Sequence, residues 1–386
     1  MNTSPKKSVV IAFPSRAHGG CEEYALTIAR AVHKQGYQVH TLFSELAETA
    51  SLRKAFSTFE TSFTPLILHY RSPGRFRRIR FGWDILRIVV VLLKKRPYVV
   101  HVSLPWPDTA TELLLACALL RIRTVVTYQL VSEKFKISSK LRRRYLWAKA
   151  HHQEWVAVSE NNRKILCNAF NLPESDIHLI YNGVAYPASL AQGRNVAIAN
   201  GHKHLIVAVG RLSYQKGIDL LLRAYATAQV HFPEYTLALL GEGELREELE
   251  KLAKELKVSD KVLFLGRRSD VSDWLQQAEL FVLASRSEGQ SFALLEAMAA
   301  GVPIVASNAS SIPELIGHEQ EGIIFEKDDA PDLTQKLRWA LSNSDQMKCM
   351  ALRAKEKSRQ FSREVMISDT LRLLYINNSF HTEAPQ

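Results

Sequence analysis

Short runs of apolar residues alternate with segments of helical periodicity along the chain. In the first half, strand-type runs occupy residues 8–13, 37–43, 98–103, 124–128, 155–159 and 177–181. Segments in which apolar residues recur at helical spacing lie at residues 22–33, 109–120 and 160–170. This alternation of strands and helices predicts a mostly parallel, doubly wound sheet of the α/β class.

The alternation stops over residues 184–203 and then begins again. That stretch has no apolar periodicity and contains Pro187, Gly193 and Gly201, as is typical of a linker. After it, strand-type runs recur at residues 205–209, 236–240, 262–265, 280–284 and 303–306, with helical segments at 217–230, 245–257 and within 347–375. The sequence therefore predicts two doubly wound, Rossmann-like domains that face each other across a cleft, of residues 1–190 and 191–365.

Two carboxylates follow the strand-type run at residues 280–284. Glu288 lies in a loop, and the apolar residues then run at helical spacing from Phe292 until Gly301 ends them. Glu296 lies about one turn into that helix, where side chains lean back toward the N-terminus. Both acids can therefore reach the crevice at the carboxyl end of the strand. A surface acid and a helix-face acid without a shared function remain the alternative.

The backbone between these acids predicts an anion site. The amides of Ser291, Phe292 and Ala293 are unpaired donors at the positive end of the helix. Phosphate groups at the helix end, with hydroxyl-binding acids on either side, suit a nucleotide sugar.

Two cations follow another strand in the same predicted domain. The run at residues 205–209 ends in Gly210, followed by Arg211 and then by Lys216 just before a helix. Arginine offers a planar fork and lysine a point charge to one diphosphate. By themselves these residues indicate two surface cations, but together with Glu288 and Glu296 they favour a single site.

The first half contains a weaker phosphate signal. Gly19 and Gly20 join the run at residues 8–13 to the helical segment at 22–33, and glycine lets the backbone approach a phosphate closely. A tight turn without a ligand is the alternative, because the full dinucleotide-binding glycine pattern is absent.

Positive charge is concentrated in the first half of the chain. Residues 1–200 contain 28 Lys and Arg against 13 Asp and Glu, whereas the remaining residues contain 22 against 26. We therefore expect the first half to meet an anionic partner, which is a membrane surface, a phospholipid-linked acceptor or nucleic acid.

Aromatic and apolar residues accompany these charges. The basic segment at residues 70–80 is followed by Phe81 and Trp83 and by the apolar run at 85–93, and a second basic cluster at 140–144 precedes Trp147. This pattern favours docking of the N-terminal domain on anionic lipid headgroups, with a solvated basic loop before a core helix as the alternative. No recognised nucleic-acid motif is present, so nucleic acid is not an expected partner.

The remaining composition indicates a cytoplasmic protein, at most peripheral on the cytoplasmic face of a membrane. The first apolar run is too short for a signal peptide, and the run at residues 113–120 is too short to span a bilayer. The four cysteines have neither metal-binding nor redox spacing, which predicts reduced packing residues. They are Cys21, Cys117, Cys167 and Cys349.

Several motifs together resemble the retaining glycosyltransferases of family 4, also called glycosyl transferases group 1, which have the GT-B fold. In the second half they are VGRLSYQKG (209–217), LLGEG (239–243), FLG (264–266), SRSEGQSFALLEAMAAG (285–301) and IPEL (312–315). In the first half, GGCE (19–22), VAVSE (156–160) and YNGV (181–184) also match. The resemblance covers nearly the whole chain, and the set of motifs in the second half is specific.

The resemblance implies transfer of a sugar from a nucleoside-diphosphate sugar to an acceptor hydroxyl with retention of configuration, by a hexosyltransferase-type enzyme of cell-envelope, capsule, exopolysaccharide or lipid-linked glycan synthesis. The acceptor would be a saccharide or a lipid-linked molecule. The implied catalytic residues are Glu288, Arg211 and Lys216, and the implied donor-binding residues are Gly20, Gly210, Ser291, Phe292 and Glu296. The resemblance also assigns the tail, residues 366–386, to a helix that crosses back onto the N-terminal domain.

The chain departs from the family pattern where the donor sugar is expected. The strand ending near Tyr128 is usually followed by a histidine, and here that position is Gln129, which can donate a hydrogen bond but cannot titrate. A weakly active or inactive GT-B binding protein and a non-transferase nucleotide-sugar enzyme, such as an epimerase, are therefore alternatives. No Asp-x-Asp sequence occurs, so we expect neither a metal ion nor another cofactor.

Overall fold

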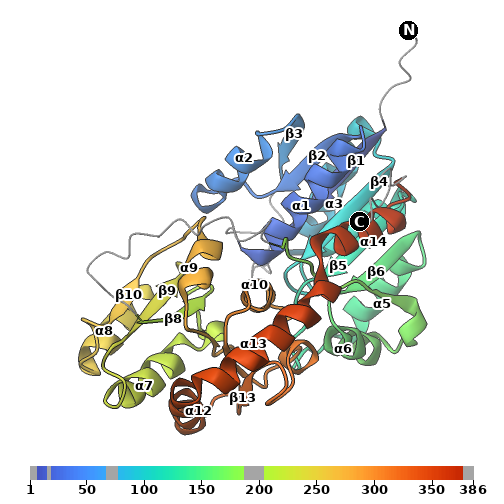
Figure 1. Ribbon diagram of the computed structural model, residues 1–386. Helices are drawn as coiled ribbons and strands as arrows, with labels where there is room; N and C mark the ends of the chain where they lie inside the picture. The colour runs from blue at the N-terminus through green and yellow to red at the C-terminus, as the bar shows by residue number, and fades with distance from the viewer. Residues whose placement is uncertain (1–6, 15–18, 67–76, 187–203, 377–386) are drawn as a thin grey trace. The chain divides into compact units, whose positions relative to one another are not determined.

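The computed structural model describes residues 7–14, 19–66, 77–186 and 204–376 (Figure 1). The chain divides into two compact units. The first contains the residues up to Asn182 together with those from Glu364 onward, and the second is Gly183–Arg363. The predicted linker therefore lies at the start of the second unit, and most of it falls outside the described residues.

The first unit is built on a seven-stranded parallel sheet. Its strands are β1 (Ser8–Ala12), β2 (Gln38–Phe43), β3 (Thr61–Pro65), β4 (Val99–Leu104), β5 (Thr124–Tyr128), β6 (Gln153–Ala157) and β7 (Ile177–Leu179), in the order β3-β2-β1-β4-β5-β6-β7. Its helices are α1 (Gly20–Lys34), α2 (Ala50–Phe56), α3 (Arg77–Lys95), α4 (Thr111–Leu119), α5 (Ser139–Lys149), α6 (Glu160–Phe170) and α14 (Arg363–Leu373).

The second unit repeats this architecture with six parallel strands. They are β8 (His204–Val209), β9 (Tyr235–Leu240), β10 (Val262–Phe264), β11 (Leu280–Leu283), β12 (Ile304–Ser307) and β13 (Ile323–Phe325), in the order β10-β9-β8-β11-β12-β13. The helices are α7 (Ile218–Gln229), α8 (Arg246–Glu255), α9 (Val271–Gln277), α10 (Phe292–Ala300), α11 (Ile312–Leu315), α12 (Ala330–Ser342) and α13 (Ser344–Ser358).

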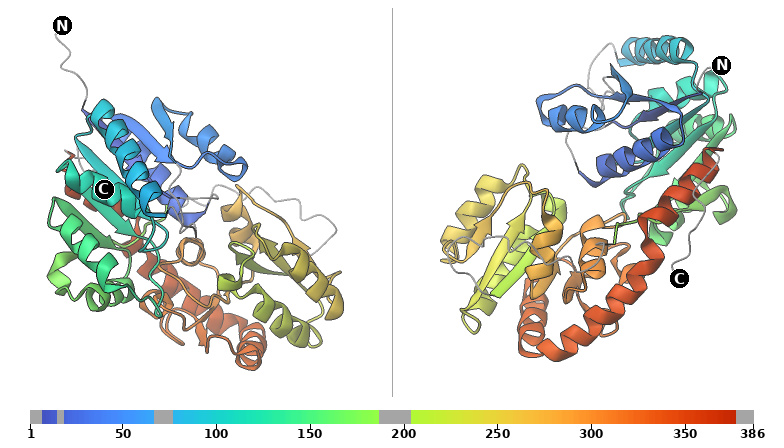
Figure 2. Two further views of the ribbon diagram at one scale, coloured as in Figure 1. Left: turned by 180° about the vertical axis from the view of Figure 1, so that it is seen from behind. Right: turned by 45° about the horizontal axis from the view of Figure 1, so that its top comes forward.

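Both sheets are doubly wound, which confirms the predicted fold class. Helices cover the two faces of each sheet (Figures 1 and 2). In each unit the strand order reverses beside the first strand, between β1 and β4 and between β8 and β11. Ligands of open α/β sheets bind at the carboxyl ends of the strands at this switch point.

One face of the first sheet packs against α3, α4 and α5. Val100 and Val102 of β4 share a buried core with Ile88 of α3, Leu113 of α4 and Tyr145 of α5. Because alternate residues of a strand face opposite sides, the neighbouring residues of β4 face the other layer of helices.

Helix α14 packs against that other face of the first sheet. The hydroxyl of Tyr24 on α1 lies 3.4 Å from Thr127 Oγ1 of β5 and 3.3 Å from Thr370 Oγ1 of α14. Arg123 donates to the carbonyl of Leu373 over 3.0 Å. The first unit is therefore completed by a segment that follows the second unit in the sequence.

Several elements were not predicted from the sequence. Strand β3 (TSFTP) is a half-exposed edge strand, and α5 contains the basic cluster that was not recognised as helical. Helices α2, α9 and α12 and strand β13 were also missed. The prediction that all four cysteines are packing residues is wrong for Cys349, which is exposed, because it lies on the solvent side of α13.

Candidate donor-binding site

The predicted site residues of the second unit converge at its switch point. Strands β8 and β11 are parallel neighbours, with Leu280 opposite Ile206 and Phe281 opposite Val207. Their carboxyl ends therefore lie side by side. The chain continues from β8 into Gly210, Arg211 and Lys216, and from β11 into the loop that carries Glu288.

Lys216 and Glu288 form an ion pair at this edge. Lys216 Nζ donates to Glu288 Oε1 over 2.5 Å, and Ser285 Oγ donates to the same oxygen over 2.6 Å. Glu288 is 5% exposed, so the ammonium group supplies the charge compensation that a buried carboxylate requires. Oε2 of Glu288 accepts no hydrogen bond from the described residues.

The segment that carries Lys216 is held on the β11 loop by one side-chain and one backbone hydrogen bond. Gln215 Nε2 donates to the carbonyl of Ser287 over 2.8 Å, and the amide of Arg286 donates to the carbonyl of Gln215 over 2.7 Å. Gly217 follows with φ +62°, and a Cβ there would lie 2.0 Å from the carbonyl oxygen of Ala284. Only glycine allows this close approach of the two segments of the backbone.

Arg286 fastens the same two loops through its side chain. Its guanidinium donates twice to Asp219 of α7, over 2.8 Å each, and lies 4.1 Å from the ring centroid of Tyr214. The hydrogen bond with Asp219 raises the pKa of Arg286. Burial favours the neutral form of Asp219, but the hydrogen bonds and charge of Arg286 outweigh it and hold the pKa of that carboxyl below its ordinary value.

The Arg286–Asp219 pair was not predicted from the sequence. A signal was present, because Arg286 is two residues before Glu288 and Asp219 is three residues after Lys216. The pair links the loop after β11, which carries Glu288, to the start of α7, which follows Lys216.

The ends of β8 and β9 approach each other closely beside Lys216. The amide of Gly210 donates to the carbonyl of Leu240 over 2.9 Å, and a Cβ on Gly241 would lie 1.8 Å from the carbonyl oxygen of Gly210. The aliphatic part of Lys216 packs over Gly210, with 3.2 Å from its Cδ to a Cβ built there. Arg211 is exposed, and its side chain forms no ion pair within the part of the chain that the structure describes.

The N-terminus of α10 lies in the same loop system. Ser291 caps the helix, and its Oγ accepts from the amide of Leu294 over 3.4 Å. Within the described ranges, the amides of Ser291, Phe292 and Ala293 donate to no backbone carbonyl. Unpaired amides at the positive end of a helix are able to bind an anion. Glu296 lies half-buried one turn further along.

The first unit holds the two other predicted residues. Gly20 is the first residue of α1, behind Gly19, whose amide donates to Glu22 Oε2 over 2.7 Å. Gln129 follows β5, and its Oε1 accepts from Asn182 Nδ2 over 3.2 Å. Its buried Nε2 has no hydrogen-bond partner among the described residues, so both N–H donors of this side chain are unused there.

Two further features concern metals and membranes. Among the described residues, no three His, Cys, Asp or Glu side chains gather as ligands of one metal ion. No helix in the described ranges combines the length and the apolar composition needed to cross a bilayer.

Known family profiles match both units of the chain. The family profile described as "Glycosyltransferase Family 4" matches residues 18–185, and that described as "Glycosyl transferases group 1" matches residues 193–359. A Haemophilus influenzae protein called an uncharacterized glycosyltransferase is 33% identical over 160 residues, which cover 41% of this chain and 44% of that protein.

A second relative has a named activity. It is the N-acetylgalactosamine-N,N'-diacetylbacillosaminyl-diphospho-undecaprenol 4-alpha-N-acetylgalactosaminyltransferase of Campylobacter jejuni. The identity is 31% over 217 residues, which cover 56% of this chain and 58% of that enzyme. The chain thus spans about half the length of the curated relatives it matches.

Solved structures resemble the whole chain. HepE of Anabaena, in complex with UDP and glucose, superposes with a TM-score of 0.77 at 18% identity, over 96% of this chain and 99% of HepE. A glycosyltransferase from Rickettsia africae gives 0.76 at 18% identity, over 96% of this chain and 98% of that protein. At such identity the likeness shows the fold. The chain belongs to the group 1 glycosyltransferases of family 4, and its fold is GT-B.

Proposed function

We propose that this protein transfers a sugar from a nucleoside-diphosphate sugar to an acceptor hydroxyl, with retention of configuration. The observation that carries the proposal is the convergence, at one switch point, of two cations, a buried carboxylate and the free amides of a helix N-terminus. The second unit binds the donor in this proposal, and the first binds the acceptor.

The donor diphosphate would lie between α10 and the loop after β8. The amides of Ser291 and Phe292 would hold the distal phosphate, with Arg211 and Lys216 beside it. An ammonium group has three N–H donors, so Lys216 can keep its hydrogen bond to Glu288 and still donate to a phosphate oxygen. Glu296 would hold the ribose hydroxyls.

Glu288 would orient the donor sugar. Its Oε1 is occupied by Lys216 and Ser285, and its Oε2 is available to accept from a sugar hydroxyl. The buried position fixes the carboxylate, so a hydroxyl bound there has one orientation. Gln129 of the first unit would donate an N–H to the acceptor.

Bond cleavage would be driven by stabilisation of the leaving diphosphate. The sugar becomes cationic in the transition state while the diphosphate gains negative charge. Fixed cations and amides that face such developing charge contribute several kcal/mol, on the order of 3 kcal/mol for each donor. These groups would supply the charge that a metal ion supplies in other phosphate sites.

The family relatives support a place in glycan assembly. One is named for transfer onto a diphospho-undecaprenol-linked saccharide, and another is the lipopolysaccharide core mannosyltransferase of Rhizobium leguminosarum. We propose an acceptor of the same class, a cell-surface saccharide or its lipid-linked precursor.

A thermal-shift panel with UDP, GDP, ADP and CMP and their sugars tests donor binding. One diphosphate should raise the melting temperature of the wild type, because a ligand at about 100 times its Kd adds roughly 2.7 kcal/mol of stability. Lys216→Met should abolish the shift, whereas Lys251→Met on the exposed side of α8 should keep it. A wild type that responds to none of the panel overturns donor binding.

A nucleotide-sugar-binding protein without transferase activity is the second candidate, and Gln129 is the observation that favours it. Single-turnover assays with the selected donor separate the two. Release of the nucleoside diphosphate together with a glycosylated acceptor supports the transferase, and donor binding without turnover supports the binding protein.

A further inference from the structure

Helix α3 of the first unit is apolar on two faces. Ile85, Ile88 and Leu92 pack into the core of the unit. A second set of apolar side chains on α3 is exposed: Ile79 at 60%, Trp83 at 60%, Leu86 at 50%, Val90 at 42% and Leu93 at 56%. A contiguous set of exposed large apolar side chains of this kind is typical of a surface that binds a partner.

The exposed residues of α3 form one stripe. Successive members are four, three, four and three residues apart, which places them above one another along the helix. Arg80, Arg87 and Lys94 are also exposed, and each directly follows a stripe residue, so they form a basic row along its edge. Lys and Arg at such positions lay their aliphatic stems on apolar surface and keep their charge in the polar layer.

Helices α4 and α5 extend this surface. Leu119 at the end of α4 is 57% exposed, and Trp147 of α5 is 40% exposed. Lys140 and Arg143 of α5 are exposed as well, and the guanidinium of Arg144 lies 4.8 Å from the ring centroid of Phe81 on α3. The face therefore continues from α3 across its neighbours.

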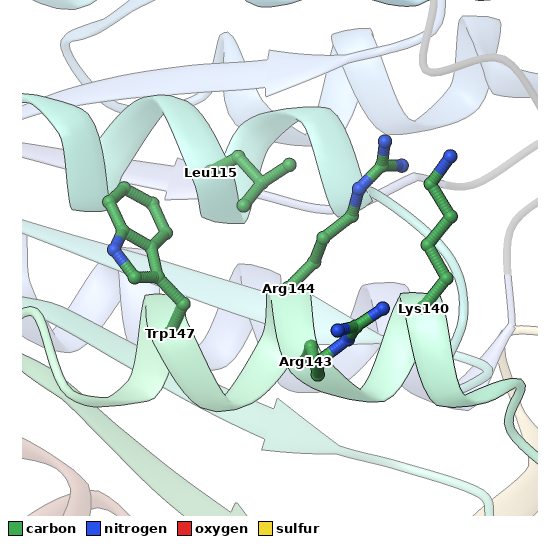
Figure 3. Close-up of a pocket in the computed structure, with 5 residues that line it drawn as sticks. All are labelled: Leu115, Lys140, Arg143, Arg144 and Trp147. Carbon is green, nitrogen blue, oxygen red and sulfur yellow. The ribbon is translucent and has the colours of Figure 1, made fainter.

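An open depression on this face combines basic and aromatic side chains (Figure 3). Its volume is about 260 Å³, and it is lined by Leu115, Lys140, Arg143, Arg144 and Trp147. In Figure 3 the side chains of Lys140 and Arg144 extend from α5 on the same side, and Leu115 lies on the neighbouring helix α4. The arrangement suits an anionic group next to an apolar chain.

The charge of the three helices is predominantly positive. Helices α3 and α5 contain eleven Lys and Arg, whereas the carboxylates on α3, α4 and α5 are Asp84 and Glu112, both half-buried. A partner of complementary charge is therefore anionic.

We propose that this docking face, formed by the exposed side chains of α3, α4 and α5, binds the surface of an anionic lipid bilayer. Its residues are Ile79, Arg80, Trp83, Leu86, Arg87, Val90, Leu93, Lys94, Leu119, Lys140, Arg143 and Trp147. The stripe of α3 enters the boundary between headgroups and acyl chains, and the basic residues contact lipid phosphates. The basic segment at residues 70–76 lies outside the described residues and is not needed for this placement.

Two other occupants fit the face less well. A nucleic-acid backbone is anionic but has no apolar layer to accept Leu86, Val90 and Leu93. A second copy of the chain, docked through the same face, would bring the basic rows of the two copies together, which costs free energy. A bilayer surface satisfies both the apolar stripe and the charge.

Co-sedimentation with vesicles tests the proposal on the full chain. Vesicles of phosphatidylcholine mixed with phosphatidylglycerol should sediment the wild type at low salt, whereas phosphatidylcholine alone should retain much less. Lys140→Gln/Arg143→Gln should weaken partition to the mixed vesicles by roughly thirtyfold. Trp83→Gln/Leu86→Gln should weaken it by at least roughly tenfold.

Matched controls separate the docking face from general charge and hydrophobicity. Lys164→Gln removes an exposed charge of α6, and Leu352→Gln removes an apolar side chain on α13 that is 67% exposed; both should bind as the wild type. Unchanged circular-dichroism melting shows that each variant is folded. Brominated lipids should quench wild-type tryptophan fluorescence more than that of the Trp83→Gln/Leu86→Gln variant.

Three outcomes overturn the proposal. The wild type does not sediment with the mixed vesicles at low salt, or the two face variants bind as well as the wild type. The third outcome is that the face binds random duplex DNA, or a second copy seen by light scattering, and no vesicle. Because none of these readouts involves a nucleotide sugar, the result is independent of the proposed transferase activity.

Discussion

The ion pair between Lys216 and Glu288 predicts a measurable coupling in the stability of the second unit. Glu288 is 5% exposed and the side chain of Lys216 is 18% exposed, with 2.5 Å between Nζ and Oε1. Removal of one partner of a fully buried pair costs about 3–5 kcal/mol, because the other charge is left without compensation. The hydrogen bond from Ser285 remains in Lys216→Met, so we expect a loss of about 2–3 kcal/mol.

Glu288→Gln should restore part of that loss when it is combined with Lys216→Met. The amide is neutral, so the double variant leaves no unpaired charge in the site. We expect an interaction free energy of about 1–3 kcal/mol between the two substitutions.

Urea unfolding of the four proteins of this cycle gives the measurement, followed through the transition of the second unit. The exposed pair Lys251–Glu255, whose side chains are 79% and 59% exposed, is the matched control and should show no measurable coupling. If the losses of unfolding free energy from the two single substitutions sum to the loss of the double variant within about 0.5 kcal/mol, Lys216 does not compensate the charge of Glu288 as we infer.

Three further predictions follow from the same structure. Burial lowers the pKa of His101 from its ordinary value of 6.5 to about 3. Between these values the unfolded chain binds a proton that the folded chain does not, so the free energy of unfolding falls by about 1.4 kcal/mol per pH unit as the pH drops from 6.5. His101→Gln should flatten this slope in pH-dependent urea unfolding, and an unchanged slope would mean that His101 is not its cause. Gly217→Ala, with φ +62° and 2.0 Å from the new Cβ to the carbonyl oxygen of Ala284, should cost at least about 2 kcal/mol in thermal unfolding. Gly36→Ala, at φ +81° with no atom within 4 Å, is its control and should cost clearly less; equal losses would mean that the contact with Ala284 is unimportant. EDTA should leave transferase turnover unchanged, since cations and amides hold the diphosphate in our proposal; a loss of turnover that Mg²⁺ restores would contradict it.

The strand ends of the site were predictable because buried strands and their terminal glycines are strong local signals. The runs ending before Gly210 and at residue 284 are β8 and β11, and the loop acid and the cation do lie at the carboxyl edge of the sheet. The contact between Lys216 and Glu288 was not predictable in the same way. It depends on β8 and β11 being neighbours, and that strand order is not encoded in apolar periodicity.

Contacts between distant loops account for most of what the sequence analysis missed. Arg286 and Asp219 are 67 residues apart, and although Arg286 lies in the motif at residues 285–301, nothing local in the sequence indicates that Asp219 is its partner. Helix α5 was missed because three consecutive arginines conceal the apolar residues Leu141, Tyr145 and Ala148, which face the core only once the helix forms. The exposed stripe of α3 was likewise hidden, because the run at residues 85–93 is apolar on both faces and its two sets of residues are distinguishable only in the folded unit.

The position of α14 has a consequence for folding during synthesis. Strands β1 to β7 have all been made when the chain reaches Asn182, but α14, with the buried residues Met366 and Leu371, belongs to the same unit. At roughly 5–20 residues per second, the ribosome needs about 10–40 s to produce the intervening second unit. Throughout that time one face of the first sheet awaits its last helix, so the unit that emerges first from the ribosome is completed last.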